Sequence, residues 1–170
     1  MNEMIYNFVS DILKQNKEVV FIGIGTPNSY LDSIGPRIGT ELSKHYPLVY
    51  GTVKEPAHAL SLETIYDQVI EKHPDAYIIA IDAMISSNLG KISVCEGPIK
   101  PGAGLGKQLI KIGSHSIKIA TVERGQECYL RDKILNLSSE AIELRNNLET
   151  NVSIVSRAII QALKDNKNII

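Results

Sequence analysis

Apolar residues in this chain fall into two kinds of pattern, which alternate along the sequence. Residues 19–24 form an almost unbroken apolar run that is rich in β-branched side chains and closed by Gly25. Such a run is typical of a strand buried on both faces of a parallel sheet. Residues 77–81 form a second run of this kind, which ends at Asp82. Weaker strand patterns cover residues 48–53, 91–96 and 116–121.

Helical periodicity occupies the segments between and after these strands. In residues 1–17 the apolar positions recur with the i, i+3, i+4 spacing of an amphipathic helix, which argues against a targeting peptide. Further helices are predicted over residues 33–44, 61–72 and 138–164, the last with an interruption near 149–151. Asp32 or Ser33 is expected to cap the helix over 33–44. Gly35 and Gly39, four residues apart, allow that helix to approach the sheet closely.

Alternating strands and helices predict an α/β fold: a three-layer α/β/α sandwich with a mostly parallel central sheet. At 170 residues the chain is expected to form one domain, residues 1–170. In this architecture the loops after residues 24 and 81 share one edge of the sheet. We therefore expect Asp32 and Asp82 to face one another at the carboxyl ends of neighbouring strands, where open α/β sheets place their active sites.

Charge and composition narrow the class of partner. The formal net charge is −1, with 44% hydrophobic and 22% charged residues. This balance provides no basic surface for nucleic acid, and no apolar run reaches membrane-spanning length. Cys95 and Cys128 form neither a disulfide framework nor a CxxC pair, which favours reduced thiols in a cytoplasmic protein.

Common nucleotide and hydrolase motifs do not fit. A GxGxxG fingerprint beginning at Gly23 would need glycine where Asn28 stands, and a P-loop ending at Lys107 would need glycine at Pro101 and Ser or Thr at Gln108. The chain contains no GxSxG and no HExxH. The remaining candidate chemistry is that of the two strand-end acids.

Two nearby carboxyls can share one proton, because both cannot ionise cheaply at short range. The ionised member can then activate water while the protonated member polarises an amide carbonyl. Alternatively, the two acids and a histidine, His115 or His58, could hold a divalent metal. Structural roles remain open as well: Asp32 as a helix cap, and Asp82 as a cap of the loop that follows it.

Loops beside the predicted cleft supply candidate substrate contacts. Glu55 and His58 lie in the loop that precedes the helix over 61–72, either at the rim of the cleft or simply in solvent. The backbone N–H groups of Gly102, Gly104 and Gly106 could bind a peptide carbonyl or carboxylate. The alternative for this glycine-rich segment is a flexible connection.

Four segments taken together, GIGT…LDSIGP, EPAHALSLE, AIDA and GPIKPGAGLGK, resemble the spore protease family of spore-forming bacteria. That family is similar to the germination protease, which degrades small acid-soluble spore proteins, and more distantly to the hydrogenase maturation endopeptidases. The resemblance covers residues 19–121. Leu31 departs from it, because relatives more usually have a small residue beside this aspartate.

The resemblance implies a phosphorylase/hydrolase-like fold and a hydrolase, more narrowly a protease, with Asp32 and Asp82 as the catalytic pair. His115 lies near the position where the maturation endopeptidases have a metal-binding histidine. The resemblance therefore also implies a metal site formed by Asp32, Asp82 and His115. The implied substrates are peptides or proteins, including small spore proteins, and the implied place is the cytoplasm of the forespore or mother cell. A non-catalytic sporulation protein that binds peptide or metal on the same fold is the alternative. Homo-oligomerisation remains open.

Overall fold

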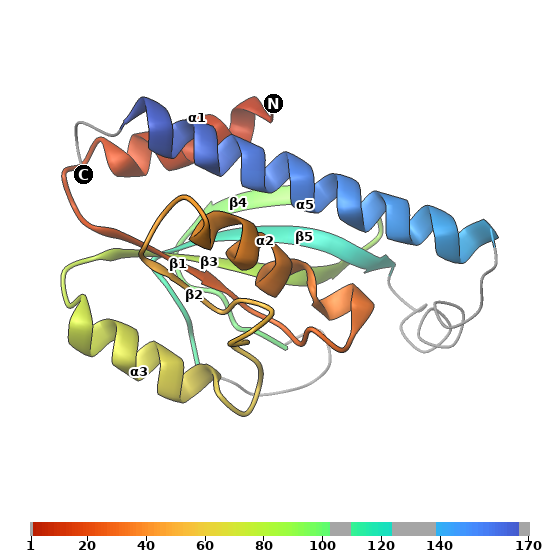
Figure 1. Cartoon of the computed structure of the whole chain (residues 1–170), viewed down its shortest axis with the longest axis horizontal. Coiled ribbons are helices and arrows are strands. Elements are labelled where there is room, and N and C mark those ends of the chain that lie inside the picture. The colour runs from red at the N-terminus through yellow and green to blue at the C-terminus, as the bar shows by residue number, and fades with distance from the viewer. Residues whose placement is uncertain (1, 103–109, 124–138, 167–170) are drawn as a thin grey trace.

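The central sheet has five strands in the order β2-β1-β3-β5-β4 (Figure 1). It is seen in a computed structural model that describes residues 2–102, 110–123 and 139–166. β1, β2, β3 and β5 run parallel, and β4 pairs antiparallel with β5, so the prediction of a mostly parallel sheet is confirmed. The strands are β1 (Val19–Gly23), β2 (Val49–Tyr50), β3 (Tyr77–Ser86), β4 (Ile92–Glu96) and β5 (His115–Glu123).

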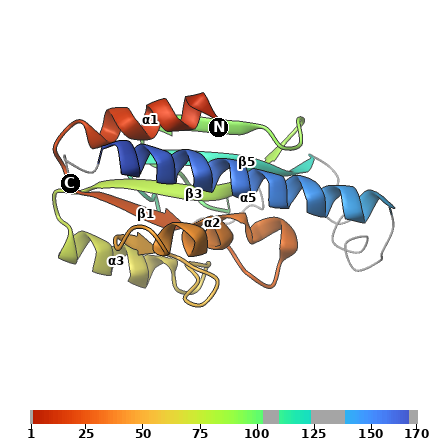
Figure 2. The same ribbon diagram turned by 45° about the horizontal axis from the view of Figure 1, so that its top comes forward.

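Helices cover both faces of this sheet, which confirms the three-layer α/β/α fold. Three of them, α1 (Glu3–Leu13), α2 (Ile34–Ser43) and α5 (Ser139–Asp165), lie on one face. On the other face lies α3 (Leu62–Lys72), and Figure 2 shows the same layers from a second direction. Each face has its own apolar core, and the core under α1, α2 and α5 contains more buried residues.

Strand residues alternate between these two cores, as the pleat of a strand requires. In β3, Ile79 and Ile81 belong to the core under α5, whereas Ile78 and Ala80 belong to the core under α3. Both sets are apolar because both faces of the sheet are covered. The next residue of the α3-side series is Asp82, so a carboxyl continues an apolar row.

Close packing of α2 on the sheet depends on glycine, as the spacing of Gly35 and Gly39 predicts. A Cβ at Gly35 would lie 2.7 Å from the carbonyl oxygen of Ile81 and closer still to the backbone of Ile24. At Gly39 it would collide with the carbonyl oxygen of Gly51. The backbone of α2 therefore rests directly on the ends of β1 and β3.

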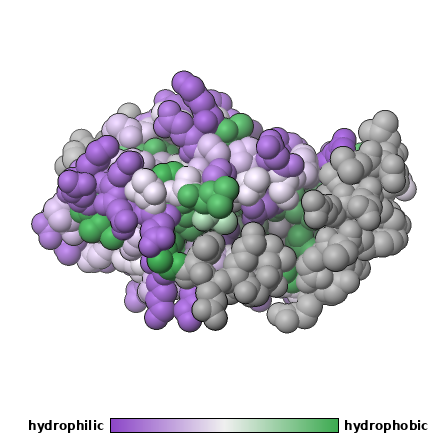
Figure 3. All heavy atoms as spheres, turned by 90° about the horizontal axis from the view of Figure 1, so that it is seen from below, coloured by the Kyte–Doolittle hydropathy of each residue, from purple (hydrophilic) through white to green (hydrophobic). Residues whose placement is uncertain are grey.

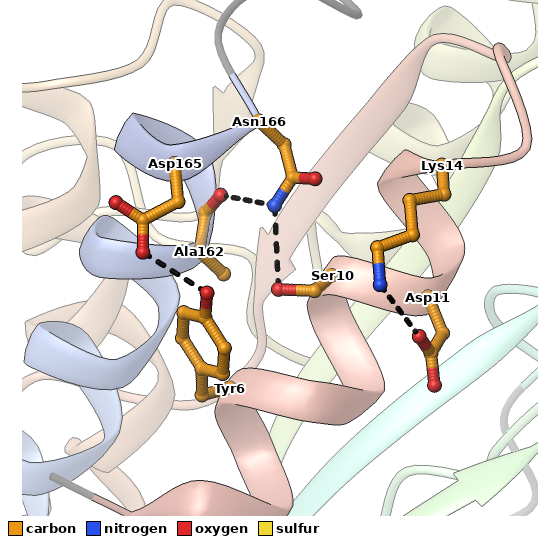
Figure 4. A network of polar contacts seen from close by, with 7 residues as sticks. All are labelled: Tyr6, Ser10, Asp11, Lys14, Ala162, Asp165 and Asn166. Atoms are coloured by element: carbon orange, nitrogen blue, oxygen red, sulfur yellow. Dashed lines mark hydrogen bonds and ion pairs between the residues drawn. The ribbon is translucent and has the colours of Figure 1, made fainter.

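The two ends of the described chain are joined through α1 and α5 (Figure 4). The Tyr6 hydroxyl donates a hydrogen bond to Asp165 Oδ2 at 3.0 Å, and Asn166 Nδ2 donates to Ser10 Oγ at 3.3 Å. Both Ser10 and Asn166 are buried, so this polar contact lies inside the helix–helix interface. Among the described helices, none is both long and apolar enough to cross a membrane.

Two elements continue past a point where the sequence pattern predicts an end or a break. β3 does not end at Asp82 but continues to Ser86, because β5 pairs with it throughout, with Asp82 opposite Lys118. α5 runs without the interruption predicted near 149–151, since Leu148, Val152 and Val155 keep one buried stripe across that point. In both elements tertiary contacts outweigh the polar residues that suggested an end.

Replacement of Gly35 by alanine is expected to destabilise the protein by about 3 kcal/mol or more, since backbone atoms of the sheet would have to move. Gly97 is the comparison: its φ is +96° and nothing lies near its missing Cβ. Gly97→Ala should cost about 1–2 kcal/mol, from backbone conformation alone. Urea unfolding of both variants measures the two costs, and equal costs would show that α2 does not rest on the sheet as described.

Candidate active site

The order of the strands reverses between β1 and β3. From β1 the chain passes through α2 to β2 on one side, and through α3 it returns to β3 on the other side. Loops diverge at such a reversal of strand order, and open α/β sheets bind their ligands there, at the carboxyl ends of the strands. Asp32 follows β1 and Asp82 lies on β3, so both predicted acids belong to this position.

Asp32 ends a short 3₁₀ helix, η1 (Tyr30–Asp32), in the connection from β1 to α2. Its carboxylate accepts a hydrogen bond from the backbone N–H of Thr26 at 2.8 Å, across the turn. The turn needs glycine at position 25, where φ is +140° and a Cβ would collide with the Asp32 carbonyl. Ser33 occupies the N-cap position of α2, one of the two predicted, but its hydroxyl donates to the Tyr30 carbonyl at 2.7 Å and makes no capping bond.

A polar cluster holds η1 against α2 and α5. The Tyr30 hydroxyl lies 3.1 Å from Glu149 Oε1, and Arg37 Nη2 lies 2.6 Å from the same oxygen. The Arg37 guanidinium also stands over the Tyr30 ring, 5.5 Å from its centroid. We call Tyr30, Arg37 and Glu149 the η1 clamp, because together they fix the segment that carries Asp32.

Asp82 lies just beyond the end of β1. Gly23, the last residue of β1, is in register with Ile81, and the N–H of Ile24 donates to the Ile81 carbonyl at 2.8 Å. From Asp82 onward β3 has no β1 partner, while β5 continues on its other side. The Asp82 side chain is therefore half-buried at the point where the sheet opens.

The two carboxyls interact electrostatically. Burial, and after it the negative charge of Asp32, raise the pKa of Asp82 to about 7. A hydrogen bond from the Ala83 backbone and the positive charge of Lys118 act in the opposite direction and lower this pKa. The two predicted acids therefore lie close enough for the charge of Asp32 to act on Asp82, and Asp82 takes up its proton near neutral pH.

His115 does not join this pair, in contrast to the predicted metal set of Asp32, Asp82 and His115. It begins β5 with its ring among the aromatic rings of Phe8 and Tyr77, at centroid distances of 5.8 and 5.2 Å. It is in register with Ile79, three residues before the Asp82 position and on the α5 face of the sheet. Burial lowers the pKa of His115. Within the described ranges no three His, Cys, Asp or Glu residues are arranged to hold a metal ion.

The predicted rim residues lie in the loop beside the end of β1. Ala57 forms a bridge with Ile24, just after the last residue of β1. Glu55 is exposed, while His58 Nδ1 accepts the Leu60 N–H at 3.3 Å at the start of α3. Seen from the α3 side, the surface is mixed, with apolar areas between hydrophilic side chains (Figure 3), and Leu60 is 93% exposed.

Only the first of the three predicted loop glycines falls within the described residues. Gly102 has a φ of +71°, in a turn that begins at the buried Pro101. Gly104 and Gly106 lie outside the described residues. Contact of this segment with a substrate stays a prediction.

Leu31, the departure from the family pattern, faces a small hollow on the α5 side of η1. The hollow leaves about 10 Å³ free, the space of about one water molecule. Its walls come from η1, the β3–β4 connection, β5 and α5: Leu31, Leu89, Gly90, Ala120, Thr121, Leu144, Asn147, Leu148 and Asn151. Leu31 therefore helps to fill the contact between η1 and α5.

Sequence reasoning missed the groups that surround the acid pair. The η1 clamp joins residues more than a hundred positions apart, so no local pattern indicates it. Lys118 had a usable signal, because a lysine interrupts the apolar strand pattern SIKIA. A charge at such a position needs a partner or a function.

Comparison with known proteins relates the chain to one family and two relatives. The family model described as "Protein of unknown function (DUF1256)" matches residues 1–156. The chain is 30% identical over 164 residues to "Uncharacterized protein YyaC" of Bacillus subtilis (strain 168). This alignment covers 91% of the present chain and 78% of YyaC. The chain is 26% identical over 145 residues to "Germination protease" of Caldanaerobacter subterraneus subsp. tengcongensis, covering 72% of this chain and 45% of that protein. The chain thus spans less than half of the protease.

The acid pair should make stability depend on pH in a definite direction. The pKa of Asp82 is about 7 in the folded protein and near 3.8 when unfolded, so the folded state binds the extra proton between these values. Stability is therefore expected to fall as pH rises through this interval. Asp82→Asn, which cannot ionise, should be more stable than the wild type at pH 8 by on the order of 1–3 kcal/mol.

Urea unfolding at pH 5 and pH 8 measures this difference. The gain of Asp82→Asn over the wild type should shrink at pH 5, while Asp67→Asn, at an exposed site on α3, should show little change at either pH. A pH-independent difference between Asp82→Asn and the wild type would mean that Asp82 ionises normally.

Proposed function

The chain belongs to the DUF1256 family, and we propose that it is a peptidase in which Asp32 and Asp82 activate water to hydrolyse a peptide bond. The observation that carries the proposal is the pairing of the two carboxyls, with the pKa of Asp82 raised to about 7 by burial and by Asp32. A pair that holds one proton at neutral pH contains both a general base and a general acid. The match to a germination protease supports the same class of reaction.

The surroundings of the two carboxyls assign their roles. Asp32 accepts the Thr26 N–H, which favours its ionised form, so Asp32 is the base. Asp82 is the acid, because burial favours its protonated form. Water forms a bond to the carbonyl carbon and gives a proton to Asp32, while the carbonyl π electrons move to oxygen, which takes the Asp82 proton. The C–N bond then breaks, the amine nitrogen takes the proton from Asp32, and a hydroxyl proton returns to Asp82.

The name of the germination protease relative supports a peptide or protein substrate in a spore-forming bacterium. Small spore proteins, in the cytoplasm of the forespore or mother cell, are the proposed substrates. Glu55, His58 and the segment from Gly102 are the proposed substrate contacts, since the loop at Ala57 borders the end of β1.

A divalent metal remains a second way to use the same carboxylates. Asp32 and Asp82 could supply two oxygen ligands, with water or substrate completing the coordination. His115 is not the third ligand, because its ring packs on the other face of the sheet. A chelator arm in the assay separates the two mechanisms.

Asp32→Asn and Asp82→Asn are each expected to lower peptide hydrolysis by about 10²–10⁴-fold, because each removes one partner in proton transfer. The assay uses a quenched-fluorescence peptide library and an acid-soluble protein extract of spores, with and without EDTA. Asp67→Asn on the exposed side of α3 is the matched control and should retain wild-type activity. Full activity of either active-site variant would exclude the acid-pair mechanism, and binding without cleavage by the wild type would favour a non-catalytic peptide-binding protein.

The pH dependence of kcat/KM provides an independent test. Activity requires a protonated Asp82, so it should fall tenfold per pH unit above about 7. We expect this alkaline fall to be visible when kcat/KM is measured between pH 5 and 9, at pH values where circular dichroism shows an intact fold. A rate that keeps rising to pH 9 would contradict the assignment of Asp82 as the acid.

A further inference from the structure

A lysine occupies the centre of the sheet directly opposite Asp82. Lys118 lies on β5 in register with Asp82 on β3 and with Ser93 on β4. Residues in register on adjacent strands point to the same face, so Lys118 and Asp82 share the α3 face of the sheet. Ile117 and Ile119, its neighbours along β5, point into the other core.

The positive charge of Lys118 makes no ion pair within the described part of the chain. Its side chain is only half-buried, and among the described residues no carboxylate oxygen lies within the 4.0 Å of an ion pair with it. Its charge nevertheless acts on Asp82. The ammonium therefore acts on Asp82 from beyond ion-pair distance, and its charge is not neutralised by a direct contact with that carboxyl.

The neighbouring residue on the same face supplies a contrast. Ser116 is 1% exposed, and its hydroxyl has no hydrogen-bond partner among the residues that the structure describes. It lies two positions before Lys118, in register with Ala80. Removal of this hydroxyl breaks no hydrogen bond between described residues. Ser116→Ala therefore tests the effect of disturbing this face of β5 without removing a charge.

We propose that Lys118 is a third member of the active site, whose ammonium binds the oxygen that gains negative charge when water adds to the scissile carbonyl. The inference rests on the proposed peptidase function. Asp82 delivers its proton to that same oxygen, so the ammonium stabilises the charge that develops before the proton arrives. A preorganised cation in a partly desolvated site is the kind of group that stabilises such a transition state.

A second effect distinguishes this role from a structural one. The charged groups acting on the Asp82 carboxyl are Asp32 on η1, which raises its pKa, and Lys118 on β5, which lowers it. Loss of the lysine charge should therefore raise the pKa of Asp82, and the fall in activity at alkaline pH should move to higher pH. A lysine that only packs would leave this limb in place.

Lys118→Met is expected to lower kcat by about 10²–10³-fold with KM changed by less than threefold, and to shift the alkaline limb upward. Lys118→Arg keeps the charge and should retain more activity, with the limb at its wild-type position. Two controls should behave as wild type: Ser116→Ala on the same face, and Lys164→Met, which loses the same charge at an exposed position in the last turn of α5. Wild-type kcat in Lys118→Met would overturn the inference while leaving the peptidase function intact.

Binding of a phosphinic peptide, an anionic mimic of the tetrahedral intermediate, is measured by calorimetry as a readout independent of turnover. Lys118→Met should bind it at least tenfold more weakly than the wild type, while affinity for the uncharged amide peptide stays the same. If the wild type binds the phosphinic peptide through Lys118 but cleaves nothing, the anion site stands and the peptidase function falls. If the wild type fails to bind it, or if Lys118→Met binds it equally well, the inference is wrong.

Discussion

A carboxyl in the body of a β-sheet, next to a second carboxyl, is the constraint around which this site is built. Burial and the neighbouring negative charge both disfavour ionisation of Asp82, and together they raise its pKa to about 7. Because this pKa is higher in the folded than in the unfolded protein, the free energy of unfolding decreases as the pH rises toward 7. Nearby groups limit the cost without removing it: the Ala83 N–H and the charge of Lys118 both favour the ionised form. As a result, Asp82 takes up a proton near neutral pH.

The scaffold holds the two acids by different means. Asp82 is fixed by the hydrogen-bonded ladder between β3 and β5, so its position is that of the sheet itself. Asp32 stands on a short 3₁₀ helix, which would be mobile without support. The Gly25 turn, the direct contact of α2 with the sheet at Gly35, and the η1 clamp from Glu149 of α5 supply that support. The long C-terminal helix thus contributes to the site without entering it.

Relatives of the chain place these features in context. The chain matches YyaC over most of both sequences, whereas it matches less than half of the germination protease. Sequence identity to these two proteins does not show which residues form a site, whereas the structure separates His115 from the two acids. The acid pair lies at the reversal of strand order, while His115 packs with Phe8 and Tyr77 on the opposite face.

Much of the fold was determined by local sequence, because buried strands and amphipathic helices each leave a periodic pattern. The runs at residues 19–24 and 77–81 identified the central strands, and the α/β/α layers followed from their alternation with helices. The position of Asp32 and Asp82 after or within these strands could also be predicted, since parallel strands end at one edge. The glycines of α2 likewise indicated close packing.

Tertiary structure alone decided which side chains share a face and which segments continue. β3 extends past Asp82 because β5 pairs beside it, and α5 stays helical through 149–151 because its buried stripe is unbroken. Lys118 lies on the same face as Asp82, and His115 does not, because side chains alternate along β5 and the register with β3 fixes which ones share that face. Such pairings depend on strand order and register, and these arise from contacts between residues far apart in the sequence.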